Sequence, residues 1–333
     1  MLSSQLLLRR HGHLRPLSLA VRRSSSSSKE LSPYQKLQKW LQPFVAGSKA
    51  MYRENQEAWQ LRRRVKEAPD GAKALNRREM LLLRQAHRDL LKSLPLLAFF
   101  CVPLIGYAAP IIGYQFPKQL LPWQFWRPDQ KTQFFQEDVQ DRARTYPELV
   151  QMLLQIQHKD DALQELLSYA KTATSSGAGG ALRPTQVSEL TSFFEGPAAL
   201  NELSTKHIHA LAEGSAVFPS FAALNKFIPQ SRLQKRLERR MEELSVDDQQ
   251  LLREGIDDLT LDELEFACRE RGIVAQYGEI EALRDALREW LSMYDTDHFN
   301  PESNPQRLPS SLLLHAPALS SFAKPDDDFD TTV

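Results

Sequence analysis

Residues 93–117 read SLPLLAFFCVPLIGYAAPIIGYQFP, an uncharged stretch that Lys92 and Lys118 bracket. A helix of about 20 apolar residues spans the hydrocarbon core of a bilayer, so the stretch predicts one transmembrane helix. The alternative is a buried hairpin in a soluble protein, which the length of the uncharged run disfavours. Proline removes a backbone donor, so its recurrence predicts a kinked span. The positions that characterise the span are Pro95, Pro103, Gly106, Pro110, Gly113 and Pro117.

Two tryptophans follow the apolar stretch. An indole ring suits the membrane–water interface, so Trp123 and Trp126 predict an interfacial collar in contact with membrane lipid. The alternative, a small aromatic cluster of a soluble protein, depends on the membrane assignment. Within the stretch, Gly106 and Gly113 lie near one helix face, where small residues permit close helix contact and a homo-oligomer. Alternatively, these glycines only relieve crowding at the kinks.

The N-terminal segment has the composition of an organellar targeting sequence. Residues 1–28 are rich in arginine and serine and contain no acid, which is typical of a mitochondrial transit peptide; a disordered basic tail is the alternative. Residues 29–92 predict a polar helical segment, with breaks at Pro43 and near Pro69.

The composition does not point to catalysis. Lysine plus arginine and aspartate plus glutamate each number 42, so no overall charge favours nucleic acid. Cys101 and Cys268 fit neither a disulfide framework nor a metal site. His207 and His209 are two residues apart and diverge on a helix, which disfavours a shared metal. With no glycine-rich phosphate loop, we expect no enzyme, no cofactor and no small-molecule substrate.

Residues 118–296 predict a helical domain. Apolar residues recur there at steps of three and four, and no segment alternates with period two, so the fold class is all-α. Helices are expected over 129–145, 148–173, 186–194 and 198–212. The tail, residues 297–333, is expected to be disordered apart from a docking segment at 312–319.

A basic helix is expected at residues 232–243, RLQKRLERRMEE. Leu233, Leu237, Met241 and Leu244 form a single apolar stripe that would pack on the other helices. The remaining face is either solvated or able to contact phosphate. The candidate phosphate contacts are Arg232, Lys235, Arg236, Arg239 and Arg240.

Residues 245–294 predict a helical hairpin. Thr260 and Glu263 form a capping box, and Gly272 supplies a left-handed stop. A second helix would then bury Ile280, Leu283, Leu287 and Trp290 on one face. The pattern weakly suggests a SAP-like nucleic-acid module, but residues 254–268 carry acids and no basic side chain.

Three stretches in combination resemble the mitochondrial leucine-zipper/EF-hand transmembrane (LETM) family. They are the proline-punctuated span with its exit motif FPKQLLP at 116–122, the segment from Asp247-Asp248 to Asp257, and LTLDEL at 259–264 with ACRERG at 267–272 and LREWL at 287–291. The similarity covers roughly residues 77–294 and is greatest to the shorter LETM1 domain-containing branch.

The resemblance implies a single-pass protein of the mitochondrial inner membrane. Its helical domain, described in the family as ribosome-binding-like, would face the matrix and bind the mitochondrial ribosome or a related assembly, supporting mitochondrial organisation and translation. The alternative is a subunit or regulator of cation/proton exchange with K⁺ or Ca²⁺. Longer members carry an acid in the span where this chain has Gly106, and an ion path normally needs an ionisable group. The charge distribution opposes this topology, because the segment before the span is the more basic.

Overall fold

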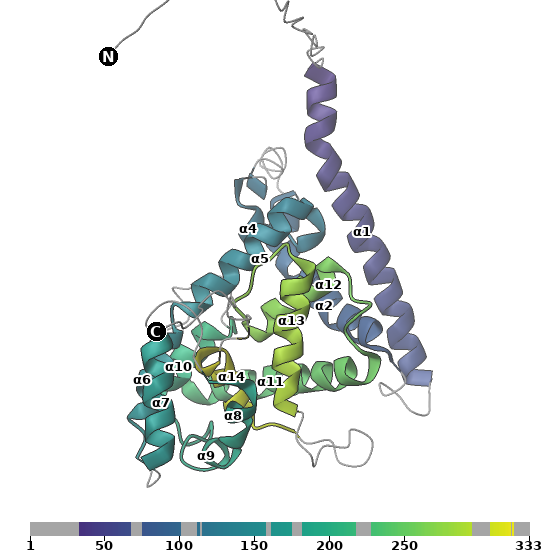
Figure 1. Cartoon of the computed structure of the whole chain (residues 1–333). Coiled ribbons are helices and arrows are strands. Elements are labelled where there is room, and N and C mark those ends of the chain that lie inside the picture. The colour runs from purple at the N-terminus through teal and green to yellow at the C-terminus, as the bar shows by residue number, and fades with distance from the viewer. Residues whose placement is uncertain are drawn as a thin grey trace, which may run out of the picture. The chain divides into compact units, whose positions relative to one another are not determined.

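The computed structural model describes residues 33–67, 75–100, 112–113, 115–157, 161–174, 182–217, 228–294, 307–320 and 322. Over these residues the chain is helical without a β-strand, which confirms the expected all-α class (Figure 1). The one pairing of extended backbone in the described part is an isolated parallel bridge between Leu182 and Ser320.

The helices follow one another closely along the chain. The α-helices are α1 Pro33–Glu67, α2 Arg77–Phe100, α4 Pro117–Leu120, α5 Pro128–Ala143, α6 Tyr146–Leu154, α7 Asp161–Thr174, α8 Pro184–Glu189, α9 Thr191–Glu195, α10 Thr205–Gly214, α11 Gln230–Glu254, α12 Leu261–Arg271, α13 Ile280–Leu291 and α14 Ser310–Leu319. Two short 3-10 turns are η3 Trp123–Phe125 and η5 Ser292–Tyr294.

The chain divides into two units, Met1–Gln42 and Pro43–Val333, and the second holds every feature described below. The expected helix break at Pro43 is wrong, because α1 continues through that residue. A proline removes one helical hydrogen bond without necessarily ending the helix.

The apolar stretch is only partly described. Helix α2 enters it and runs through Pro95 as far as Phe100. Pro103, Gly106 and Pro110 lie outside the described residues, whereas Pro117 begins α4. Among the described helices, none combines the length and the apolar character that crossing a membrane requires.

The segment expected as one helix over 148–173 forms two. Helix α6 ends at Leu154, α7 begins at Asp161, and the two pack against each other. The short connection explains the difference, since it brings both apolar stripes into one interface. Leu149 and Leu153 of α6 and Leu167 of α7 are fully or almost fully buried there.

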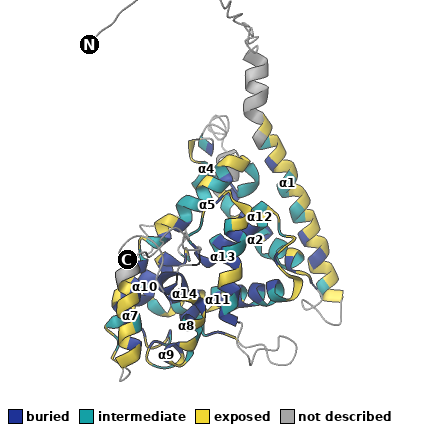
Figure 2. Ribbon diagram, in the orientation of Figure 1, coloured by how far each residue is buried: buried dark blue, intermediate teal, exposed yellow. Residues whose placement is uncertain are grey.

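Helix α14 covers the docking segment that the sequence predicted at 312–319, and it lies in the core. Every residue from Ser311 to Leu319 is buried (Figure 2). The helix contacts α6, α7, α8, α9 and α11, so it fills the space between two parts of the helical domain.

The hairpin of α12 and α13 follows the sequence expectation closely. The capping box at Thr260 and Glu263 is present, and Gly272 ends α12 at φ +75°. A Cβ at Gly272 would also lie 2.7 Å from a guanidinium nitrogen of Arg142. Both the positive φ and the lack of space therefore favour glycine at this position. Leu283, Leu287 and Trp290 are fully buried, but Ile280 is exposed and was wrongly placed on the buried face.

Two buried histidines join α10 to α14. The Nε2 atoms of His207 and His315 are 2.8 Å apart, and Nδ1 of His315 lies 2.6 Å from the carbonyl oxygen of Ser311. Since Nδ1–H of His315 donates to that carbonyl, its Nε2 accepts from His207. Burial lowers the pKa of His207 to about 4 and the pKa of His315 well below its usual value.

We expect the chain to lose stability as the pH falls below 6.5. In the unfolded chain both histidines protonate near pH 6.5, whereas burial keeps both neutral in the folded chain. The free energy of unfolding should therefore drop by about 1.4 kcal/mol per pH unit for each histidine until its pKa in the folded chain is reached. Urea unfolding at pH 7.5, 6.5 and 5.5 measures this slope. His207→Gln should flatten it, and an equal slope in both proteins would contradict the assignment.

Candidate functional site

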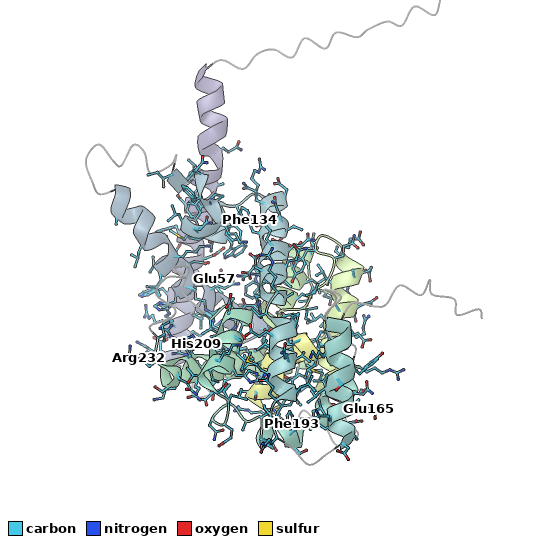
Figure 3. The ribbon with its side chains drawn as sticks, turned by 90° about the vertical axis from the view of Figure 1, so that its left-hand side faces the viewer. Glu57, Phe134, Glu165, Phe193, His209 and Arg232 are labelled. Atoms are coloured by element: carbon cyan, nitrogen blue, oxygen red, sulfur yellow. The ribbon has the colours of Figure 1, made fainter. Side chains whose placement is uncertain are left out.

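The basic face of α11 is the starting point of the site. Arg232, Lys235, Arg236 and Arg239 are exposed, and their spacing of three, four and seven residues places them on one helix face. Arg232 lies on the outside of the domain (Figure 3). The apolar stripe of the same helix is confirmed, because Leu233, Leu237, Met241 and Leu244 are all buried.

Arg240 differs from the other four predicted contacts. Its side chain is 15% exposed, and it lies within 3.4 Å of Glu270 and donates to the Glu270 backbone carbonyl at 3.2 Å. This arginine therefore links α11 to α12 as well as facing a cavity. The predicted phosphate contacts thus comprise four exposed side chains and one, Arg240, that points inward.

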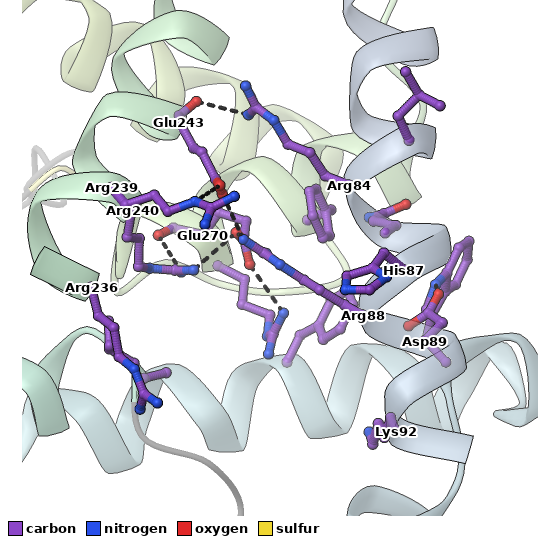
Figure 4. Close-up of a pocket in the computed structure, with 18 of the residues that line it drawn as sticks. Arg84, His87, Arg88, Asp89, Lys92, Arg236, Arg239, Arg240, Glu243 and Glu270 are labelled. Atoms are coloured by element: carbon purple, nitrogen blue, oxygen red, sulfur yellow. Dashed lines mark hydrogen bonds and ion pairs between the residues drawn. The ribbon is translucent and has the colours of Figure 1, made fainter. Parts of the chain in front are cut away.

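A cavity of about 740 Å³ lies between α2, α5, α11 and α12 (Figure 4). Of the predicted contacts, Arg236, Arg239 and Arg240 line it, while Arg232 and Lys235 do not. The cavity also receives basic residues from other helices, namely Arg84, Arg88 and Lys92 of α2, Arg142 of α5 and Arg269 of α12.

The sequence reasoning missed the contribution of α2. Arg84, Arg88 and Lys92 are spaced by four residues, which places them on one helix face and was a readable signal. Arg142 and Arg269 gave no such signal, since only the packing of α5 against α12 brings them to the cavity. Arg142 is held there by donating to the carbonyls of Gly214 and Arg269, at 2.7 and 2.5 Å.

Two carboxylates balance part of this positive charge. Glu270 lies within 3.5 Å of Arg88, Arg240 and Arg269, and Glu243 accepts from Arg88 at 2.8 Å. Burial alone would raise the pKa of Glu270, but the neighbouring guanidinium groups outweigh it and hold that pKa at about 2. Glu270 therefore remains ionised and serves as the common partner of the cavity arginines.

Lys92 lies at the end of the cavity nearest the apolar stretch. Its ammonium is 4.7 Å from the ring centre of Trp126, a cation–π contact. Burial first, and then the charge of Arg269, lower the pKa of Lys92 to about 8. The surroundings of Lys92 in the cavity therefore disfavour its charged form.

The two expected interfacial tryptophans are half-buried against the protein. Trp123 donates its indole N–H to Asp89 at 2.9 Å, and Trp126 donates to the Pro117 carbonyl at 3.0 Å. Both rings line the cavity as well. Contact of these tryptophans with lipid remains a prediction.

A buried charge network fixes α2 to the rest of the domain. Arg271 donates to Asp248 at 2.9 Å and to Asp247 at 2.8 Å, and Arg77 at the start of α2 donates to Asp247 at 2.7 Å. Although burial opposes ionisation, Arg271 and Arg77 lower the pKa of Asp247. Both aspartates look like solvated residues in the sequence of α11, which is why their burial was not expected.

The fold and the site together define an all-helical domain with a strongly basic surface and cavity. The chain belongs to the LETM1-like RBD family, whose model matches residues 75–319. It is 28% identical over 284 residues to LETM1 domain-containing protein 1 of Xenopus tropicalis, covering 84% of this chain and 75% of that protein.

Other relatives are matched over a smaller share of their length. The human LETM1 domain-containing protein 1 is 29% identical over 65% of this chain and 58% of its own. The mitochondrial proton/calcium exchanger protein of Drosophila melanogaster is 28% identical over 79% of this chain but only 24% of its own length.

Proposed function

We propose that this chain is a mitochondrial inner-membrane protein whose helical domain binds the mitochondrial ribosome through RNA phosphates. The carrying observation is the exposed basic face of α11, formed by Arg232, Lys235, Arg236 and Arg239. Clustered cations of this kind displace counterions from nucleic-acid phosphates and so gain affinity. Membership of the LETM1-like RBD family and the mitochondrial names of relatives support the proposal.

Most of these side chains are available for an external partner. No ion pair or side-chain hydrogen bond occupies Arg232, Lys235 or Arg236 within the part of the chain that the structure describes, whereas Arg239 pairs with Glu243 at 3.4 Å. Arg232, Lys235 and Arg236 can therefore contact phosphates without first breaking an internal ion pair.

The membrane part of the proposal rests on the apolar stretch at 93–117 and on the mitochondrial relatives. We place the helical domain in the matrix, where the ribosome is. The alternative of cation/proton exchange finds support only in the name of the fly relative. Among the described residues, no group of three histidine, cysteine or acidic side chains is placed to hold a metal ion.

Charge reversal on α11 should weaken ribosome binding. We expect Arg232→Glu with Lys235→Glu to lower the affinity of the full chain for mitochondrial ribosomes about tenfold or more and to reduce the slope of log K against log salt by about 1–2. Co-sedimentation in detergent over a salt series measures both quantities. Arg62→Glu with Arg253→Glu, an equal charge change at two other exposed positions, is the matched control. Equal weakening in both doubles would contradict a specific α11 contact.

A further inference from the structure

The cavity beside α11 has more positive charge than its own acids can balance. Eight lysine and arginine side chains line it against three carboxylates, an excess of five formal charges with histidine counted as neutral. Its volume of about 740 Å³ is in the range of small-molecule sites. We propose that this cavity binds a compact anion carrying two or more phosphate groups, either a soluble diphosphate or the headgroup of an anionic phospholipid.

The internal ion pairs leave cationic atoms unmatched. Glu243 and Glu270 are shared among four arginines, of which Arg269 also pairs with Asp138 at 2.9 Å outside the lining. The third acid of the lining, Asp89, already accepts from Trp123 at 2.9 Å and Gln124 at 2.6 Å. No carboxylate lies within ion-pair distance of Lys92 or Arg236 in the described part of the chain.

The unmatched groups face the cavity from different helices. Arg236 projects from α11 and Lys92 from α2, on opposite sides, and neither is joined to another labelled residue (Figure 4). The Nε atom of Arg240, which also lines the cavity, is buried without a hydrogen-bond partner.

The chemistry of these donors favours phosphate over a single carboxylate. Guanidinium groups bind phosphate with two parallel hydrogen bonds, and lysine adds a point charge. One carboxylate carries one negative charge and would leave most of the excess in place. Two phosphates could reach cations on both α2 and α11 at once.

The low pKa of Lys92 adds an observable consequence. Its charged neighbours are Arg88 and Asp89 on α2, Lys118 on α4, Asp138 on α5 and Arg269 on α12. A bound anion would stabilise the ammonium and raise its pKa above about 8, so binding should take up protons between about pH 7 and 9. Affinity should accordingly decrease as the pH rises through this range.

Both sources of the anion are compatible with the position of the cavity. Lys92 immediately precedes the apolar stretch, and Trp123 and Trp126 line the same cavity, so a lipid headgroup at a membrane surface could enter it. A soluble diphosphate needs only the cations. The experiment therefore uses one probe of each kind.

If the ligand is soluble, we expect the full chain in detergent to bind inorganic pyrophosphate. If the ligand is a lipid, we expect the full chain to bind vesicles of phosphatidylcholine with cardiolipin more tightly than vesicles of phosphatidylcholine alone. Tryptophan fluorescence and calorimetry in buffers of different ionisation enthalpy report binding and proton uptake. Lys92→Met with Arg84→Gln should weaken binding at least about tenfold. Arg232→Gln with Lys235→Gln, which removes two cations of α11 outside the cavity, should leave it unchanged. Lys92→Arg should keep binding and abolish proton uptake.

The outcomes distinguish a soluble ligand from a lipid headgroup, and they test the cavity independently of ribosome binding. Saturable binding of pyrophosphate assigns a soluble ligand, and binding of cardiolipin vesicles alone assigns a lipid; both support the site if the cavity variants weaken it. Failure of both probes to bind, or equal weakening by the control pair, overturns it. If the double cavity variant fails to fold, Arg236→Gln decides, since that side chain has no partner to lose in the described chain, and undiminished binding then refutes the site. Because ribosome binding is tested on Arg232 and Lys235, either proposal can fail alone.

Discussion

Arg271→Met is expected to lower the free energy of unfolding by about 3–5 kcal/mol, because it leaves the buried carboxylate of Asp248 without a cation and leaves Asp247 with Arg77 alone. The Arg271 side chain is fully buried and donates to Asp247, Asp248 and the carbonyl of Ala267. Asp248 also accepts from the indole of Trp290 at 3.2 Å and from Tyr294 at 2.7 Å. These two donors are uncharged and cannot replace the cation at Asp248. Urea unfolding followed by tryptophan fluorescence would measure the loss.

Two further variants distinguish a buried charge effect from a simple loss of contacts. Adding Asp248→Asn to Arg271→Met should recover part of the stability, because the uncompensated charge is removed while Asp247 keeps its pair with Arg77. Arg288→Met, which breaks pairs with Asp285 and Asp257 at an arginine 56% exposed, should cost less than about 1 kcal/mol. A loss in Arg271→Met as small as in Arg288→Met would show that the network contributes little.

The same network connects stability to the basic cavity. Arg77 shares Asp247 with Arg271, and the Arg77 backbone N–H donates to Glu254 at 3.0 Å. These bonds hold the first turn of α2 against α11, and α2 then carries Arg84 and Lys92 to the cavity. The aspartates therefore position the cationic side chains without contacting a ligand themselves.

The features that sequence alone predicted correctly are local. The capping box at Thr260, the left-handed Gly272 and the apolar stripe of α11 each depend on residues within one or two turns. Such patterns act on the backbone directly, so they can be read before the tertiary structure is known.

The features that sequence missed depend on packing between distant segments. In the sequence, Asp248 lies in the highly charged segment that forms α11. Nothing local indicates that Arg271, Trp290 and Tyr294 donate hydrogen bonds to its carboxylate. The phosphate-contact prediction placed Arg240 with its exposed neighbours for the same reason. Its half-buried position follows from Glu270, which is 30 residues further along the chain.

Helix α14 shows why a docking segment can be predicted without its burial on every side. Its sequence, SSLLLHAPAL, contains Pro317 and has no polar face, so no amphipathic period is visible. A helix that is apolar all round is buried on every side, and here α6, α7, α8, α9 and α11 supply the surrounding surface. The prolines of the tail predicted disorder around this segment, and the uniform hydrophobicity of the segment is the signal of its burial.

Leu312→Asp is therefore expected to abolish cooperative folding of the domain. Leu312 is fully buried, and a carboxylate there would be left without a cation, at a cost of more than about 4 kcal/mol in a domain whose total stability is about 5–15 kcal/mol. Ser310→Asp, at the first residue of the same helix, is the matched control. It places the same charge at a half-buried helix N-terminus, where the macrodipole favours an acid, so it should be neutral or slightly stabilising. Calorimetry compares the two variants, and a cooperative transition in Leu312→Asp at the temperature of the parent protein would remove α14 from the folding core.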